Sequence, residues 1–149
     1  MQLSLETATP SDLDAVKALV EAAYRPWVAE VGLEPGPLHD DYAARIAAGQ
    51  VRLAQVDGRL AGLLVLIQAG DHLLLDNVAI APGMQGRGLG RALVDKAEET
   101  AWRLGLPEVR LYTHARMTSN IALYERLGFH ETHRVTEKGF DRVYMAKPV

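Results

Sequence analysis

The stretch QGRGLGRAL, residues 85–93, carries three glycines at alternate positions: Gly86, Gly88 and Gly90. It follows an apolar run typical of a strand and leads into a pattern typical of a helix. The first N–H groups of a helix have no internal partner, and the helix dipole favours negative charge there. Glycine lets the backbone approach a ligand closely because no Cβ intervenes. The stretch therefore predicts a phosphate-binding loop between a strand and a helix.

Two common nucleotide-binding patterns do not fit the spacing of these glycines. A Walker A loop requires G-x-x-x-x-G-K-[ST], but Gly90 is followed by Arg91 and Ala92. The dinucleotide fingerprint G-x-G-x-x-G has a different step, and this loop follows an expected antiparallel meander in the middle of the chain. The spacing that remains is Q-x-x-G-x-G, formed by Gln85, Gly88 and Gly90.

The residues on both sides of the loop predict one α/β domain over residues 1–149, with a mixed sheet of about seven strands and about four helices. Asp57-Gly58 is a strong hairpin signal, and Lys138-Gly139 is expected to join the last two strands. The expected strands cover residues 3–7, 50–56, 59–69, 72–81, 108–114, 129–137 and 140–147. The expected helices cover about residues 10–24, 40–48, 89–104 and 118–127, with a loop at 32–40.

The composition excludes several classes of function. A net charge of −3 leaves no general basic surface for nucleic acid. The absence of cysteine excludes disulfides, thiolate zinc sites and a cysteine nucleophile. Because the N-terminus lacks a secretory pattern and the apolar run at 60–69 is too short to cross a bilayer, we expect a cytoplasmic protein without a membrane span. The histidines have no spacing typical of metal ligands, so we predict no metal.

Two segments carry a resemblance to a known family. With the preceding DNVAIAP, residues 76–82, the Q-x-x-G-x-G spacing resembles the pyrophosphate loop of the GNAT superfamily, the acyl-CoA-dependent N-acyltransferases. IALYERLGF, residues 121–129, resembles its second signature, a helix with a tyrosine before a Leu-Gly-Phe turn. The order of elements fits along essentially the whole chain. The resemblance implies a GNAT fold, with fourth and fifth strands that splay apart around the pantetheine arm of acetyl-CoA.

The resemblance also implies which residues hold the cosubstrate. The backbone of Val78, Ala79 and Ile80 would pair with the pantetheine arm, and a bulge there would aim an N–H at the thioester carbonyl. Arg87 and Arg91 could add charge near the phosphates or could be ordinary solvated residues. The amides expected to hold the pyrophosphate are those of Gln85, Gly86, Arg87, Gly88, Leu89 and Gly90.

Tyr124 matches the family tyrosine that protonates the departing thiolate of CoA. A phenol with a pKa of about 10 carries its proton at neutral pH, so it can act as an acid. The alternative is a tyrosine packed in the core. Asn120 lies one helical turn earlier on the same face, where it could bind the pantetheine amides or make a bond at the helix start. Many family members carry that asparagine seven residues before the tyrosine, where this chain has Met117.

The general base is left open. A primary amine is protonated at neutral pH, so a side chain or a water molecule must accept a proton. Asp76 and Asn77 are neighbours on an expected strand and should point to opposite faces. Tyr112 and His114 share one face of the next expected strand and are the other candidates.

The predicted function is transfer of an acetyl group from acetyl-CoA to a primary amine of a small molecule or peptide. Without cysteine there can be no thioester acyl-enzyme, so direct attack in a ternary complex is the simplest mechanism. The resemblance implies that the first helix and the loop after it wall the acceptor side, and the aromatic residues of this region suggest a partly apolar or cationic acceptor, although core packing is the alternative. These aromatic residues are Tyr24, Trp27, His39 and Tyr42. Rival interpretations are a non-catalytic acyl-CoA-binding regulatory module and a nucleotide-binding protein. The family resemblance is also compatible with a homodimer.

Overall fold

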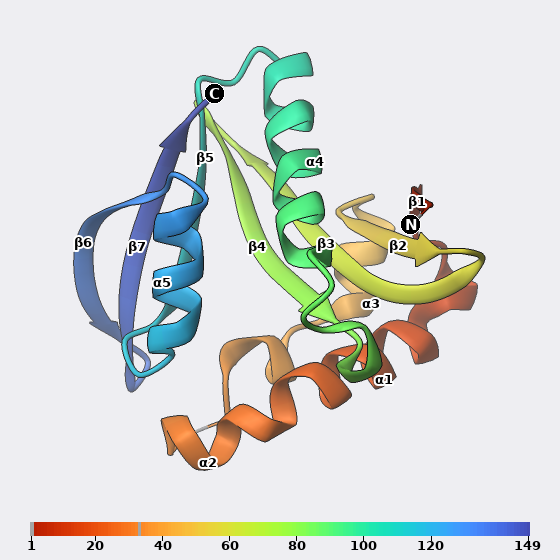
Figure 1. The fold of residues 1–149 in the computed structure, drawn as a ribbon, viewed down its shortest axis with the longest axis horizontal. Coiled ribbons are helices and arrows are strands. Elements are labelled where there is room, and N and C mark those ends of the chain that lie inside the picture. Colours follow the sequence, from red (N-terminus) through yellow and green to blue (C-terminus); the bar gives the residue numbers. More distant parts are fainter. Residues whose placement is uncertain (1, 33) are drawn as a thin grey trace.

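A seven-stranded mixed sheet forms the centre of the computed structural model, which describes residues 2–32 and 34–149 (Figure 1). The strand order is β1-β2-β3-β4-β5-β7-β6, and all neighbours are antiparallel except β4 and β5. The strands are β1 (Leu3–Thr7), β2 (Val51–Val56), β3 (Arg59–Ala69), β4 (His72–Ile80), β5 (Glu108–His114), β6 (His130–Glu137) and β7 (Phe140–Pro148). This arrangement confirms the predicted α/β class and every expected strand.

The helices also follow the predicted order. They are α1 (Leu13–Tyr24), α2 (Val28–Val31), α3 (Tyr42–Ala47), α4 (Leu89–Arg103) and α5 (Thr118–Arg126). A short 3₁₀ turn from Pro10 leads into α1, and the N–H of Thr9 donates to Asp12 Oδ2 at 2.8 Å. A second 3₁₀ turn, Arg25–Trp27, contains Pro26 and separates α1 from α2. A third, Gly36–His39, lies within the expected loop at 32–40.

The two predicted hairpin turns have the required backbone. Asp57 and Gly58 have φ values of 51° and 80°, and Lys138 and Gly139 have 52° and 82°. Two consecutive residues with positive φ form the turn whose twist matches paired strands. The pattern therefore predicted these connections from local chemistry alone.

Two apolar cores cover the two faces of the sheet. Leu64 and Leu66 of β3 pack with α4 and with the end of α5, whereas Leu63 and Val65 pack with α1 and α3. This alternation follows from the two-residue period of a strand. In Figure 1, α4 crosses the sheet close to β4, and α5 lies beside β7.

The splay predicted between the fourth and fifth strands is present. β4 and β5 share only two register pairs, Leu73 with Val109 and Leu74 with Arg110. Figure 1 shows the two strands together near the C-terminus and increasingly apart below it. The sheet is therefore open along the second half of β4.

A bulge in β4 lies at Asp76, and not at residues 78–80 as expected. On β3, Val65 pairs with Asn77 and Leu66 pairs with Leu75, so Asp76 has no partner there. The extra residue shifts the alternation of the strand. As a result, Leu75 packs in the core beneath α4, whereas Ala79 packs in the core beneath α1.

Candidate active site

Three adjoining cavities occupy the opening between β4 and β5. The loop cavity, about 450 Å³, is bordered by the glycine stretch, the second half of β4 and the beginnings of α4 and α5. The inner cavity shares Tyr24, Val78 and Asn120 with it and continues between β4 and β5. The outer cavity, about 300 Å³, continues from the inner one between the 3₁₀ turn Gly36–His39 and the β6–β7 hairpin. Because neighbouring cavities share lining residues, the three together are called the cleft.

The backbone of β4 presents alternate residues to this cleft. The N–H of Ala81 donates to the Ala61 carbonyl at 2.8 Å. Because hydrogen-bonded pairs alternate along an antiparallel ladder, Ala79 also directs its backbone groups to β3. Val78 and Ile80 therefore direct their N–H and C=O groups away from β3. Their carbonyls accept from Tyr24 Oη at 2.9 Å and from Gln85 Nε2 at 3.4 Å, respectively.

Ala79 differs from its two neighbours. It pairs with Leu63 in the part of the ladder where both backbone groups point to β3, and its side chain is buried. Of the three residues expected to pair with pantetheine, only Val78 and Ile80 thus have backbone groups available in the cleft.

The glycine stretch has the geometry of an anion cradle. Gly86 and Gly88 have φ values of 77° and 78°, a left-handed conformation that residues with a Cβ rarely adopt. A Cβ added at Gly86, Gly88 or Gly90 would meet no atom within 4 Å, so these positions border open space. Gly88 is the N-cap of α4, whose first N–H groups lack partners inside the helix. These features fit a pyrophosphate.

The two arginines of the loop differ in position. Arg91 borders the loop cavity, and Arg87 does not. Arg91 is therefore the better placed of the two to approach a phosphate.

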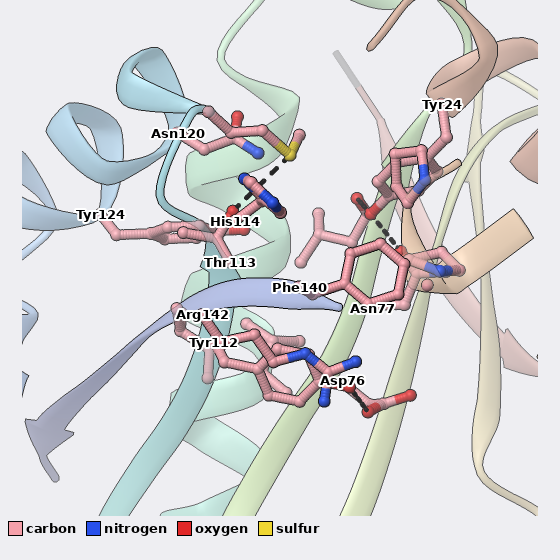
Figure 2. A pocket seen from close by; sticks show the side chains of 17 residues that line it. Tyr24, Asp76, Asn77, Tyr112, Thr113, His114, Asn120, Tyr124, Phe140 and Arg142 are labelled. Carbon is pink, nitrogen blue, oxygen red and sulfur yellow. Dashed lines mark hydrogen bonds between the residues drawn. The ribbon is translucent and has the colours of Figure 1, made fainter. Parts of the chain in front are cut away.

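Tyr124 borders the inner cavity, and Asn120 borders both the inner and the loop cavities (Figure 2). Burial raises the pKa of Tyr124 to about 12. Among the described residues, none forms a hydrogen bond with its hydroxyl, while its ring packs edge-on against Phe129 at 5.7 Å between centroids. Tyr124 is thus a neutral phenol beside the cleft with a proton to donate.

Asn120 does not cap α5, because Met117 is the N-cap and no side chain caps it. Met117, at the position where many family members have asparagine, is 3% exposed and accepts a weak bond from Thr113 at 3.9 Å. The side chain at position 117 is therefore part of the apolar wall, and Asn120 is the amide that borders the cleft.

A chain of hydrogen bonds links β4 to the 3₁₀ turn after α2. The Tyr24 hydroxyl bonds to the Asn77 side-chain oxygen, Asn77 Nδ2 donates to Tyr42 Oη at 3.0 Å, and Tyr42 Oη donates to the Pro37 carbonyl at 2.6 Å. Burial raises the pKa of Tyr24 well above its usual value, so its hydroxyl stays protonated. Asn77 is only 4% exposed and holds this part of the cleft together.

Asp76 and Asn77 both border the inner and outer cavities, contrary to the prediction of opposite faces. The bulge at Asp76 is the reason, because it interrupts the alternation of the strand. Tyr112 Oη donates to Asp76 Oδ1 at 3.4 Å, and burial raises the pKa of the Asp76 carboxyl. Figure 2 shows these side chains together with Arg142 on one side of the cavity.

His114 borders the inner cavity but is poorly arranged to accept a proton. Burial lowers its pKa, which favours the neutral ring. Its Nδ1 accepts the N–H of Arg116 at 3.1 Å. A neutral imidazole whose Nδ1 accepts a hydrogen bond carries its proton on Nε2, so neither nitrogen has a free lone pair.

Comparison with known proteins identifies the family of the chain. The model of the acetyltransferase (GNAT) family matches residues 16–129. The chain belongs to this family. It is therefore an acetyl-CoA-dependent N-acyltransferase, and acetyl-CoA is its cosubstrate. The GNAT assignment agrees with the fit of the glycine loop to a pyrophosphate.

Individual GNAT relatives support the family at different distances. The chain is 31% identical over 99 residues to the [ribosomal protein bS18]-alanine N-acetyltransferase of Escherichia coli (strain K12), covering 62% of this chain and 67% of that one. It is 39% identical over 77 residues to a mycothiol acetyltransferase of Nocardia farcinica, covering 51% of this chain and 24% of the relative. The paia N-acetyltransferase of Thermoplasma acidophilum, in complex with coenzyme A, shares the fold with a TM-score of 0.82 at 19% identity over both whole chains.

The four aromatic residues expected to wall the acceptor side of the GNAT cleft divide between the cavities. Of the three cavities, Trp27 borders only the loop cavity. Tyr42 is 5% exposed and His39 borders the outer cavity.

Sequence patterns missed one residue of the GNAT site. Arg142 borders both the inner and outer cavities and stands in no recognisable motif. Tyr24 was expected near the acceptor, but its hydrogen bond to the carbonyl of Val78 was not. Among the described residues of the GNAT chain, no group of three or more His, Asp or Glu side chains is arranged for a metal ion, and no helix is long and apolar enough to span a membrane.

Proposed function

We propose that the enzyme transfers the acetyl group of acetyl-CoA to a primary amine of a small molecule or peptide, by direct attack in a ternary complex. One observation carries the proposal: the loop cavity and the inner cavity adjoin and share Val78 in their walls, and the inner cavity is also bordered by a neutral Tyr124. Both substrates can then meet in one cleft. The absence of cysteine rules out a thioester acyl-enzyme.

The chain's own groups suit the binding of the cosubstrate. The amides of the glycine stretch and the start of α4 would hold the pyrophosphate. The exposed backbone groups of Val78 and Ile80 would pair with the pantetheine arm, and Asn120 would bond to one of its amides. The N–H of Val78 would donate to the thioester carbonyl oxygen and stabilise the charge that develops there.

Asp76 is the best placed proton acceptor of the four candidates. Asn77 is an amide used in a hydrogen-bond chain. His114 accepts a hydrogen bond at Nδ1 and, as a neutral ring, carries its proton on Nε2, so it has no free lone pair. Burial raises the pKa of Tyr112 to about 12, so its phenolate is scarce at neutral pH. Asp76 is a carboxylate bordering the inner cavity, where it would attract the ammonium form of the acceptor and take its proton, directly or through one water.

The complete transfer then balances. A bond forms between the amine nitrogen and the acetyl carbon, and the carbon–sulfur bond breaks. The ammonium form of the acceptor gives one proton to Asp76, and Tyr124 donates its proton to the departing thiolate. The second proton that the nitrogen loses as the amide forms returns Tyr124 to its neutral form, through water, and Asp76 releases its proton to solvent. Positioning of the two substrates in one cleft supplies the rest of the rate enhancement.

Two-substrate kinetics and tryptophan fluorescence test this proposal together. The chain has two tryptophans, and Trp102 is 74% exposed outside the three cavities, so Trp102→Phe leaves Trp27 as a reporter of the loop cavity. We expect CoA and acetyl-CoA to change its emission saturably, whereas ATP and NAD at equal concentrations do not.

With an accepted amine, initial velocities at several fixed concentrations should give intersecting double-reciprocal lines. Parallel lines would indicate an acetylated enzyme and contradict direct attack. Saturable binding of CoA without thiol release for any amine would favour the regulatory module.

Asp76→Asn should lower kcat/KM. It should also remove the part of the fall in kcat/KM at acidic pH that is caused by protonation of Asp76. The same substitution should raise the free energy of unfolding at neutral pH. The folded-state pKa is raised above the unfolded value, so the ionised carboxylate destabilises the folded state above that pKa. The gain should disappear as the pH falls below the unfolded pKa. Urea unfolding and rate profiles across pH measure both effects.

Asp71→Asn provides a matched control on the turn that immediately precedes β4. Asp71 is exposed, and its hydrogen bond with His72 lowers its pKa, so its removal should not stabilise the protein at neutral pH. An Asp76→Asn enzyme with an unchanged pH profile would rule out Asp76 as the base.

A further inference from the structure

Arg142 of β7 borders both the inner and the outer cavities, and its side chain is held in place on three sides. Its guanidinium lies over the ring of Tyr112 at 4.5 Å and near that of Phe140 at 5.5 Å. Its Nη1 donates to Glu137 Oε2 at 3.1 Å. The side chain is only 15% exposed. A largely desolvated and oriented guanidinium is suited to binding an anion.

The second terminal nitrogen of Arg142 faces across the cleft. Nη2 is the nearest atom to the position of a Cβ at Gly36, at 3.8 Å, so it is directed at the turn that closes the other side. Because Gly36 has no side chain, this part of the cleft stays open. Lys138, on the turn between β6 and β7, also borders the outer cavity. Within the described chain it forms no salt bridge.

The charges along the cleft are separated by sign. Asp40 and Arg45 neutralise one another at 3.2 Å, and Glu137 pairs with Arg142, one of the two hairpin cations that border the outer cavity. One positive charge therefore remains at the end formed by Arg142 and Lys138. Asp76 supplies a negative charge from β4 and borders the same two cavities as Arg142. Tyr112 contacts both Asp76 and Arg142, which makes the space between the two ends short.

We propose that the acceptor is a small zwitterion of the amino acid type, whose amino group lies at Asp76 and whose carboxylate binds Arg142. This inference rests on the proposed acetyl transfer and names its substrate class. A molecule with both charges matches Asp76 with its cation and the net positive charge of Arg142 and Lys138 with its anion, whereas a simple amine leaves that positive charge unmatched. Since one tyrosine contacts both ends, the two charged groups belong to one short molecule and not to distant parts of a polypeptide.

The test compares free amino acids with their carboxamides as acceptors. Thiol release from acetyl-CoA is measured for a panel of L-amino acids, for the matching amides, and for tetrapeptide amides with the same N-terminal residues. For the best acceptor, kcat/KM of the free acid should exceed that of its amide by about tenfold or more, mainly through KM. Arg142→Gln should bring this ratio close to one, and Arg142→Lys should retain part of the preference.

Arg134→Gln is the matched control on the same hairpin. Arg134 pairs with the exposed Glu131 at 3.0 Å and borders none of the three cavities, so the acid-to-amide ratio should be unchanged. Trp27 emission in each variant confirms that acetyl-CoA still binds.

Four results would overturn the inference. An amide could match its free acid in the native enzyme, or tetrapeptide amides could exceed every amino acid. Arg142→Gln could reduce the rates of acid and amide equally, which would indicate a structural role. If no member of the panel reacts although Trp27 reports binding of acetyl-CoA, the small zwitterion is excluded while the cosubstrate assignment stands.

Discussion

Tyr124→Phe should lower kcat by about 100- to 10,000-fold while leaving the affinity for acetyl-CoA nearly unchanged. The substitution removes only the hydroxyl, so the ring still packs against Phe129 and the inner cavity keeps its shape. What is lost is the proton for the departing thiolate. Because no other residue in the described chain bonds to that hydroxyl, its removal leaves no buried partner unsatisfied. Stability should therefore change little.

The pH dependence separates this role from a structural one. Burial raises the pKa of Tyr124 to about 12, so the phenol stays protonated across the range in which the enzyme can be assayed. The loss of rate in Tyr124→Phe should thus be the same from mildly acidic to mildly alkaline pH.

Tyr144→Phe is the control, since it removes a hydroxyl that borders none of the three cavities, and its kcat should stay near the native value. A fully active Tyr124→Phe enzyme would show that the thiolate leaves without an acid.

Gly88→Glu should abolish measurable binding of acetyl-CoA and of CoA. Position 88 has a left-handed backbone, which costs a residue with a Cβ about 1–2 kcal/mol. The larger effect is electrostatic, because the new carboxylate would stand at the positive end of α4, where the pyrophosphate is expected. In the native protein, ligand at 100 times its Kd should raise the free energy of unfolding by about 2.7 kcal/mol. Thermal unfolding with and without each ligand measures the difference.

Gly58→Glu separates charge at the loop from backbone strain. Gly58 has a φ of 80°, and a Cβ there would also meet no atom within 4 Å, but it lies on the β2–β3 turn outside the three cavities. It should share the loss of stability and keep the full response to acetyl-CoA. Gly88→Ala adds the strain without the charge and should fall between the two. Equal responses in native protein and Gly88→Glu would refute the proposed place of the pyrophosphate.

Local patterns predicted the seven strands and the four longer helices, but not the separate short helix α2. Asp57-Gly58 and Lys138-Gly139 predicted their turns because two positive φ values are a property of the dipeptide itself. The bulge at Asp76 was not predictable, because it depends on how β3 pairs with β4 and leaves no mark on the composition of β4. For this reason the prediction that Asp76 and Asn77 point to opposite faces was wrong, and both border the cleft.

Some residues of the site could be expected from the sequence, and others depend on the tertiary fold. The glycine stretch and Tyr124 lie in the two segments that resemble the family's signatures, so the resemblance was sufficient to expect both beside the cleft. Tyr24 and Arg142 reach the cleft from α1 and from the last strand, and only the tertiary fold brings them to β4 and Tyr112.

The opening beside β4 has a consequence for the life of the protein in a cell. The fold leaves the backbone of Val78 and Ile80 without a neighbouring strand on one side, so a bound cosubstrate would complete the sheet. Any ligand that binds only the folded state reduces the fraction of unfolded molecules that proteases can cleave. Starvation for acetyl-CoA would then shorten the half-life of the enzyme, and its abundance would follow the supply of acyl donor without any change in gene expression.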